Sequence, residues 1–203
     1  MKQFVVGITG GSGVGKTTLI NLLNKSFKDQ ITIFSLDNYY KAKSDQDVDE
    51  NGVINFDLPS ALDTQQLAKD LKLLLNEKSI KQNIYHFNNP NRLAEVHHIS
   101  PKQIIVVEGL FVMHYPFVKS ELDLAVYISV DEKKQLERRL KRDVKERNYD
   151  KDEVLYQWHN HVIPAYKSFI EPYAKECDII INNELDFDEN LKELISIIKN
   201  NAN

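Results

Sequence analysis

Cysteine, glycine and long apolar runs are all scarce in this chain of 203 residues. The single cysteine, Cys177, excludes a disulfide within the chain, and such low cysteine use is common in reducing compartments. No stretch approaches the ~18 consecutive apolar residues that span a bilayer. The apolar start MKQFVV lacks the pattern of a signal peptide. We therefore expect a cytoplasmic protein without a membrane partner.

An excess of positive charge is also missing. The chain has 26 lysines and arginines against 30 acidic residues, which gives a formal net charge of -4. A general nucleic-acid binder would be basic, so we expect no nucleic-acid partner. Hydrophobic residues make up 42% and charged residues 28% of the chain, which is ordinary for a globular domain.

Five short runs rich in valine and isoleucine predict the strands of a parallel sheet. They do not alternate apolar with polar residues, so both faces of the sheet should be covered. The runs span residues 4–9, 31–36, 103–108, 124–130 and 178–181. Helical patterns occupy 17–27, 60–75, 131–145, 154–170 and 188–199. This alternation predicts right-handed βαβ units in a three-layer α/β domain.

Two segments fall outside this alternation. Residues 37–59 form a long polar stretch, and residues 82–100 read as two strands around an Asn-Asn-Pro-Asn turn. We place that hairpin as an insertion at the rim of the sheet. Tyr85 and Phe87 alternate with His86 on its first strand, so they should share a face that stacks on a flat base or covers the sheet edge.

Five of the seven glycines fall between Gly7 and Gly15. The run Gly10-Gly11-Ser12-Gly13-Val14-Gly15-Lys16-Thr17 matches G-x-x-x-x-G-K-[ST], between a predicted strand and a predicted helix. Such a loop turns successive N–H groups onto an anion, next to the positive end of the helix. Lys16 would reach the β- and γ-phosphates of ATP, and the Thr17 hydroxyl would bind Mg²⁺. Thr18 is also expected among the ATP-binding residues. The alternative interpretation of the whole run is a plain turn between a strand and a helix.

Two carboxylates stand at the ends of predicted strands. Asp37 follows the second strand, and Glu108 ends the third. The carboxyl ends of strands in an open α/β sheet line the ligand crevice. One acid near a triphosphate can hold Mg²⁺, and the other can accept a proton from an attacking hydroxyl. The alternative is that each is a solvated loop acid or a helix cap.

A basic run, RRLKRDVKER, covers residues 138–147 and holds six basic and two acidic side chains. In a helix, Arg139 and Arg142 would be neighbours at i and i+3. Arginine forks match phosphate oxygens, so this helix is a candidate lid over a γ-phosphate. The alternative is a solvated helix with local ion pairs to Asp143 and Glu146.

Histidine pairs do not predict a zinc site. His97 and His98 are adjacent on a predicted strand and point to opposite faces. His159 and His161 are two apart on a predicted helix and also diverge.

Taken together, these motifs resemble those of the uridine–cytidine kinases, within the wider group that contains phosphoribulokinase. The resemblance covers nearly the whole length and rests on GGSGVGKTT, SLDNYY, NFDLPSALD, VVEG, RRLKRDVKER and the hairpin ending in Arg92. It implies one P-loop kinase domain over residues 1–203, with a five-stranded parallel core, a β-hairpin insertion near 82–100 and an arginine-rich lid near 131–150. It also implies phosphoryl transfer from ATP, with Mg²⁺, to the 5′-hydroxyl of a pyrimidine nucleoside, uridine or cytidine. The implied assembly is a homo-oligomer, a tetramer or a dimer.

The same resemblance assigns roles to single residues. Asp37 matches the catalytic carboxylate, and Glu108 matches the acid beside Mg²⁺. Arg142 and Arg147 match lid or catalytic arginines. The ribose hydroxyls would be held by Asp57 and Arg139, and the positions around the nucleoside are Tyr40, Phe56, Tyr85, Phe87 and Gln157.

Four positions depart from the family pattern. Pro90 stands where the family has a histidine that contacts the base, Asn148-Tyr149 replace Gly-Arg, and Leu58 replaces the histidine of FDHP. Proline offers no hydrogen-bond donor. Base recognition would therefore rest on Tyr85 and Gln157, with Asn89 or Asn91 of the same turn as further candidates, and we expect weak discrimination between uridine and cytidine.

Two other functions stay open. The nearest keeps the fold and phosphorylates another small hydroxyl substrate, such as nicotinamide riboside. The other is a nucleotide-dependent switch, for which the chain offers only Asp49-Glu50-Asn51-Gly52 in a polar stretch and Asn24-Lys25 inside a predicted helix.

Overall fold

A sheet of five parallel strands forms the centre of the computed structural model, which describes residues 3–87 and 95–202. The strand order is β2-β5-β1-β6-β7, and every neighbouring pair is parallel. The prediction of an α/β fold with a five-stranded parallel sheet is confirmed. The strands are β1 (Phe4–Thr9), β2 (Ile31–Ser35), β5 (Ile104–Glu108), β6 (Leu124–Ser129) and β7 (Ile179–Asn182).

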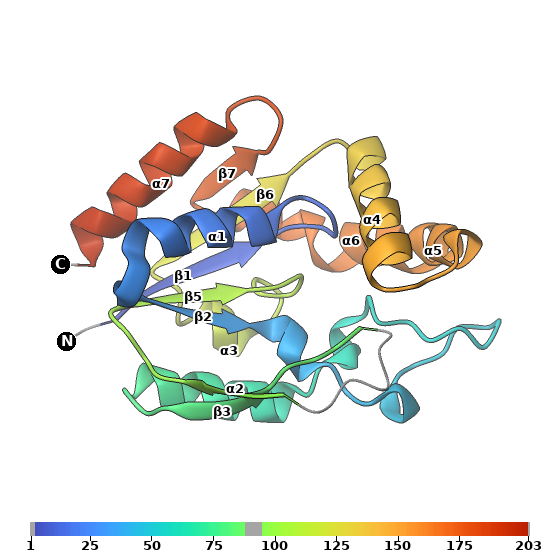
Figure 1. The fold of residues 1–203 in the computed structure, drawn as a ribbon, viewed down its shortest axis with the longest axis horizontal. Coiled ribbons are helices and arrows are strands. Elements are labelled where there is room, and N and C mark those ends of the chain that lie inside the picture. Colours follow the sequence, from blue (N-terminus) through green and yellow to red (C-terminus); the bar gives the residue numbers. More distant parts are fainter. Residues whose placement is uncertain (1–2, 88–94, 203) are drawn as a thin grey trace.

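Helices cover both faces of this sheet, as its apolar strands require. On one face, α1 (Lys16–Phe27) and α7 (Phe187–Asn201) share a buried cluster with β1, β6 and β7. On the other, α2 (Thr64–Leu75) and α3 (Pro116–Lys119) pack on β2 and β5. The two helical layers lie above and below the strands in Figure 1. Within the described residues, no helix has both the length and the apolar character needed to cross a membrane.

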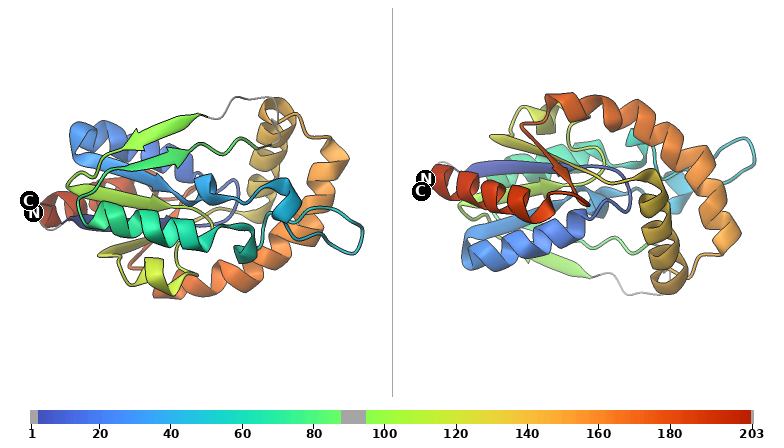
Figure 2. Two further views of the ribbon diagram at one scale, coloured as in Figure 1. Left: turned by 90° about the horizontal axis from the view of Figure 1, so that it is seen from below. Right: turned by 90° about the horizontal axis from the view of Figure 1, so that it is seen from above.

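A helical arm stands beyond the carboxyl ends of the strands. It starts with α4 (Glu132–Glu146) and continues through α5 (Lys151–Gln157), a π-helical turn (Trp158–Val162) and α6 (Ile163–Phe169). The strand arrowheads in Figure 1 point toward α4 and α5. Residues 40–58, here called the long loop, lie beside α5 in both views of Figure 2. Sheet, arm and long loop therefore surround one end of the domain.

Two helix starts differ from the sequence prediction by three or more residues. The helix expected from Ser60 begins at Thr64, because Asp63 caps it by accepting a hydrogen bond from the backbone N–H of Gln66 at 3.0 Å. Ser60 instead lies in a separate turn and donates to Asp47 at 2.7 Å. The helix expected from Val154 begins earlier, after Asp150, which caps it through the backbone N–H of Asp152.

The inserted hairpin, predicted over residues 82–100, has a first strand that starts and ends earlier than expected. Its strands β3 (Ile80–Asn83) and β4 (Val96–Ile99) pair in antiparallel fashion and form a separate two-stranded sheet. Because β3 ends at Asn83, the strand alternation expected for Tyr85 and Phe87 is wrong. The turn with Pro90, and Arg92, fall outside the described residues.

Leu23 tests how α1 packs on the sheet. Its side chain is fully buried in the cluster beneath α1 and α7, so Leu23→Ala removes apolar contacts and leaves a cavity. We expect the free energy of unfolding in urea to fall by about 2–5 kcal/mol. The exposed Lys25→Ala on the same helix is the control and should change it by less than ~0.5 kcal/mol. Equal losses in both variants would contradict this packing.

Candidate active site

A cavity of about 290 Å³ lies at the carboxyl ends of the strands. Its walls come from the glycine loop after β1, the strand ends, α4 and the long loop. Among the residues expected from the sequence, it is lined by Ser12, Gly13, Gly15, Lys16, Thr17, Asp37, Tyr40, Phe56, Asp57, Phe87, Glu108, Arg139, Arg142, Arg147 and Gln157. The structure thus brings most of the expected site together, although these positions come from distant parts of the chain.

Five expected residues lie outside this lining. Gly10, Gly11 and Val14 are buried within the glycine loop, and Thr18 is exposed on α1. The ring of Tyr85 contacts the rings of Tyr40 and Phe87, which do line the cavity.

Glycine is required in the loop where other backbone comes close. Gly10 has φ of 144°, and a Cβ there would lie 2.4 Å from the carbonyl oxygen of Ile128. Gly13 has φ of 80°, and a Cβ there would lie 2.7 Å from the carbonyl oxygen of Gln135 in α4. Both φ values disfavour side chains. The absence of side chains therefore lets α4 pack directly on the loop.

Lys16 folds back over this loop. Its Nζ donates to the carbonyl oxygens of Gly10 at 2.9 Å and Gly11 at 3.1 Å. Burial lowers the pKa of Lys16, while the nearby carboxylates of Asp37 and Glu108 oppose that shift. The Lys16 side chain is therefore enclosed between loop carbonyls and two acids.

The two strand-end acids are half-buried and line the cavity together. Burial raises the pKa of Asp37, and Lys16 opposes this. Burial also raises the pKa of Glu108 to about 7, and the charge of Asp37 adds to the effect. The alternative prediction, that each acid is fully solvated in a loop, is therefore wrong. Such a pair, desolvated and close to one lysine, is typical of a site that handles protons or cations.

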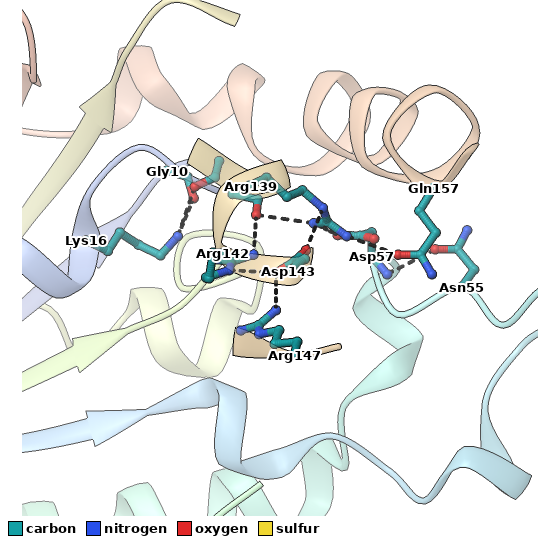
Figure 3. A network of polar contacts seen from close by, with 11 residues as sticks. Gly10, Lys16, Asn55, Asp57, Arg139, Arg142, Asp143, Arg147 and Gln157 are labelled. Atoms are coloured by element: carbon teal, nitrogen blue, oxygen red, sulfur yellow. Dashed lines mark hydrogen bonds and ion pairs between the residues drawn. The ribbon is translucent and has the colours of Figure 1, made fainter. Parts of the chain in front are cut away.

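Three arginines in and just after α4 converge on one acid. The Asp143 carboxylate is 2% exposed and pairs with Arg142 Nε at 2.7 Å, Arg139 Nε at 3.2 Å and Arg147 Nη1 at 3.2 Å. Arg139 and Arg142 also donate to the Ser12 hydroxyl at 3.2 and 3.3 Å. Figure 3 shows this convergence on Asp143, with Lys16 at one side. The basic helix is therefore docked on the glycine loop, not solvated on all sides.

Arg139 also reaches the opposite wall. Its Nη2 donates to Gln157 Oε1 at 3.3 Å, and its Nη1 lies 3.8 Å from Asp57 Oδ1. Asp57 is held in turn by a hydrogen bond from its backbone N–H to Asn55 Oδ1 at 3.0 Å. An acid, an arginine and an amide thus meet at one point of the cavity, at the right of Figure 3. Such a group can bind a pair of neighbouring hydroxyls.

An aromatic cluster bounds the same end of the cavity. The ring of Tyr40 lies with its centroid 5.2 Å from Tyr85, 5.3 Å from Phe87 and 6.0 Å from Phe56. The Arg147 guanidinium stands over Phe87, 4.1 Å from its centroid. Tyr85 and Phe87 do meet, at 4.9 Å, although no strand aligns them. These faces offer a surface on which a flat ring can stack.

Of the lining residues that were not among the expected site residues, Asp143 and Tyr149 are the two that stand beside the arginines. Asp143 was expected only as a partner on a solvated helix. Its i, i+4 spacing from both Arg139 and Arg147 was the available signal, because it puts the three on one face. Tyr149 also lines the cavity. It follows Asn148, whose φ is 55°, and the sequence marked it only as a departure from the family's Gly-Arg, without a role in the site.

Sequence features of other protein classes lie away from the cavity. His97 and His98 are exposed on β4, and the described residues contain no group of three or more histidine, cysteine or acidic side chains suited to a metal ion. Asn24 and Lys25 lie inside α1. Asp49 sits in the long loop, where Tyr156 and His161 bind it. None of these residues lines the cavity.

Glu108→Gln tests the burial of these acids. The pKa of about 7, against an ordinary value of 4.5, means that the folded protein holds more protons than the unfolded chain between these values. Ionisation of this group therefore lowers stability as the pH rises through that window. We expect the variant to be more stable than the wild type in urea at pH 8 and little changed at pH 4. The exposed Glu193→Gln should show no such dependence; a loss of stability at both pH values in Glu108→Gln would refute this.

Comparison with known proteins agrees with this arrangement. The model of the phosphoribulokinase/uridine kinase family matches residues 5–188. A uridine kinase of Clostridium novyi is 36% identical over 206 residues, covering 99% of each chain, and one of Clostridium tetani is 38% identical over 89% of this chain and 87% of its own.

Solved structures show the same fold at low identity. A possible uridine kinase from Bacillus stearothermophilus matches with a TM-score of 0.64 and 18% identity over 89% of both chains. Phosphoribulokinase from Rhodobacter spheroides matches with a TM-score of 0.61 and 13% identity over 92% of this chain and 74% of its own. Together with the family model and the curated relatives, the P-loop, the paired acids and the docked basic helix lead to one conclusion: the chain belongs to the phosphoribulokinase/uridine kinase family.

Proposed function

We propose that this kinase transfers the γ-phosphoryl group of ATP to the 5′-hydroxyl of a pyrimidine nucleoside, uridine or cytidine. The observation that carries the proposal is the position of Asp37. It lines the cavity together with Lys16 of the phosphate loop and with Tyr40 and Asp57 at the aromatic end, and its charge raises the pKa of Tyr40 and opposes the lowering of the pKa of Lys16. One carboxylate therefore faces both ends of the cavity. Relatives named uridine kinase support the choice of acceptor.

The phosphate end would be bound by Lys16 and the arginines of α4. An incoming phosphate oxygen offers Lys16 a stronger acceptor than the carbonyls of Gly10 and Gly11. Arg142, now on Ser12 and Asp143, would turn its remaining donors to the γ-phosphate. These fixed positive groups stabilise charge on the phosphoryl group as it transfers.

Mg²⁺ would be held by Thr17 and Glu108. The donors fit, because this ion takes oxygen ligands and is bound through one or two carboxylates plus substrate phosphates, not by a cage of protein groups. The half-buried Glu108, whose pKa is raised, also gains a counter-charge when a cation binds. The ion supplies charge neutralisation between the phosphates.

The nucleoside end would be bound by stacking and by the ribose. The rings of Tyr40, Phe56 and Phe87 offer a face for the base, and Asp57 with Arg139 offers an acceptor and donors for the ribose hydroxyls. Asp37 would accept the proton of the 5′-hydroxyl. Burial raises the pKa of Asp37, and a carboxylate with a raised pKa is a stronger general base. With α4 docked on the glycine loop, water would be kept from competing with this hydroxyl.

An ADP-release assay over a panel of nucleosides tests the proposal. The panel contains uridine, cytidine, adenosine, guanosine and nicotinamide riboside, each with ATP and Mg²⁺. We expect activity with uridine and cytidine at similar kcat/KM. Activity confined to nicotinamide riboside or to purine nucleosides would overturn the choice of acceptor. Sedimentation of the same preparation tests the homo-oligomer, which stays a prediction.

Asp37→Asn separates proton transfer from binding. The amide cannot accept the hydroxyl proton, so we expect kcat with uridine to fall by at least ~10²-fold. ATP binding, measured by calorimetry, should persist. Lost ATP binding with little loss of kcat would instead assign Asp37 to holding the metal.

Lys16→Ala tests the phosphate loop. Removing this ammonium removes charge stabilisation during transfer, so we expect kcat to fall by ~10²–10³-fold or more. The midpoint of thermal unfolding without nucleotide should change little, because the loop carbonyls regain solvent. Lys25→Ala, also on α1, should keep full activity. Turnover near the wild-type rate in Lys16→Ala would refute the loop assignment.

A further inference from the structure

The long loop carries acceptor-site residues at both of its ends. Tyr40 begins it, and Phe56 and Asp57 stand near its end. Its middle folds into a small hairpin, in which Val48 and Ile54 form a bridge and the backbone N–H of Asp49 donates to Val53 at 2.9 Å. The position of this hairpin therefore limits where Phe56 and Asp57 can stand.

Asp49 fastens the hairpin to the helical arm. Its Oδ1 accepts hydrogen bonds from the backbone N–H groups of Asn51 and Val53, both at 2.9 Å. Its Oδ2 accepts from the Tyr156 hydroxyl at 2.7 Å and lies 2.7 Å from His161 Nε2. Hydrogen bonding, above all from Tyr156, holds the pKa of Asp49 below its ordinary range. Because the ionised carboxylate can only accept, His161 Nε2 carries the proton between them.

The two residues on the arm that bind Asp49 have few other hydrogen-bond partners. His161 is 2% exposed, and its Nδ1 has no hydrogen-bond partner among residues 3–87 and 95–202. The Tyr156 hydroxyl also accepts from Asn51 Nδ2 at 2.7 Å. These contacts join residues more than 100 positions apart in the sequence. They are the polar link between the hairpin and the segment that contains α5 and the π-helical turn.

That segment holds the other wall of the acceptor site. Gln157 follows Tyr156 directly and accepts a hydrogen bond from Arg139 in the cavity. Arg139 also lies beside Asp57, which the long loop supplies. The contacts of Asp49 therefore join the long loop, which carries Asp57, to the segment that carries Gln157, at a point outside the cavity. A fixed spacing between two binding walls preserves the geometry that a bound substrate needs.

We propose that Asp49, Tyr156 and His161 form a positioning latch that sets the spacing between the long loop and α5, so that Asp57 and Gln157 contact the same nucleoside. This inference rests on the proposed function for the identity of the nucleoside. The three residues touch neither substrate, and they act through Asp57 and Gln157. Loss of the latch therefore affects acceptor binding and leaves the phosphate loop intact.

The test uses Tyr156→Phe and His161→Leu, singly and together, with uridine and ATP as the varied substrates. Each change removes a donor to Asp49 and keeps the bulk of the side chain. We expect KM for uridine to rise roughly five-fold in each single variant and further in the double variant. KM for ATP and kcat should stay within two-fold. His161→Gln, whose amide nitrogen can replace Nε2 as donor, should restore most of the affinity.

The chain offers a matched control. Tyr173→Phe also removes a tyrosine–histidine contact, the one between the Tyr173 hydroxyl and His114 Nδ1 at 3.3 Å, and neither residue lines the cavity. His159→Gln changes an exposed neighbour of His161. Both should leave KM for uridine unchanged. If they raise it as much as the latch variants do, the effect is general loosening, and the proposal fails.

Hydrogen exchange gives a readout that is independent of activity. The amides of Asn51 and Val53, which donate to Asp49, should exchange faster in the latch variants and not in the controls. Unchanged exchange would show that no latch exists. If exchange is faster but KM for uridine is unchanged, the three residues have only a structural role. The same conclusion follows if kcat falls while KM for uridine stays constant. If the panel identifies another riboside, its KM replaces that of uridine, so the two proposals fail separately.

Discussion

The carboxylate of Asp143 is the contact on which the arrangement of the site depends. A buried acid is stable only when opposite charges or hydrogen bonds compensate its lost hydration. Here three arginines supply that compensation, and their mutual repulsion is relieved by the same oxygen atoms. Two of them extend to Ser12 in the glycine loop, and one extends to Asp57 and Gln157. The basic helix, the phosphate loop and the acceptor wall therefore share one electrostatic centre.

The site also contains ionisable groups whose charged forms are destabilised by loss of hydration in the folded protein. Burial raises the pKa of Asp37 and Glu108 and lowers that of Lys16. The same low polarity strengthens every interaction between these groups and a bound triphosphate. Groups that oppose folding in the empty protein thus become favourable once counter-charges arrive. Such a balance is expected where function, not stability, sets the choice of residue.

Local signals in the sequence were enough for the phosphate loop and the sheet. A glycine-rich turn has to follow a strand and precede a helix, and valine-rich runs without alternation have to be covered on both faces. Placement of Asp37 and Glu108 followed from the strand ends. The docking of α4 could not be predicted in the same way, because the burial of Asp143 depends on elements distant in sequence.

Contacts over long separations account for the remaining differences. Asp49 and His161 meet across 112 positions, so neither looked functional in its own segment. Tyr85 and Phe87 were expected to share a strand face, yet they meet beyond the end of β3, through packing on Tyr40. Asp63 replaced Ser60 at the start of α2 because its carboxylate reaches a free N–H of the first turn.

The π-helical turn at Trp158–Val162 changes the rotational phase of the helical arm. An α-helix turns about 100° per residue, whereas a wider i→i+5 turn rotates less at each step. Before the turn, Tyr156 and Gln157 face the long loop and Arg139. After it, Tyr166 reaches the Tyr127 hydroxyl at 2.7 Å, and its ring would lie 3.2 Å from a Cβ placed on Gly11. The continuous helical segment from α5 to α6 thus contacts both the acceptor wall and the back of the phosphate loop. A single-residue insertion or deletion in this segment would therefore rotate one of these two sets of contacts away from its partners.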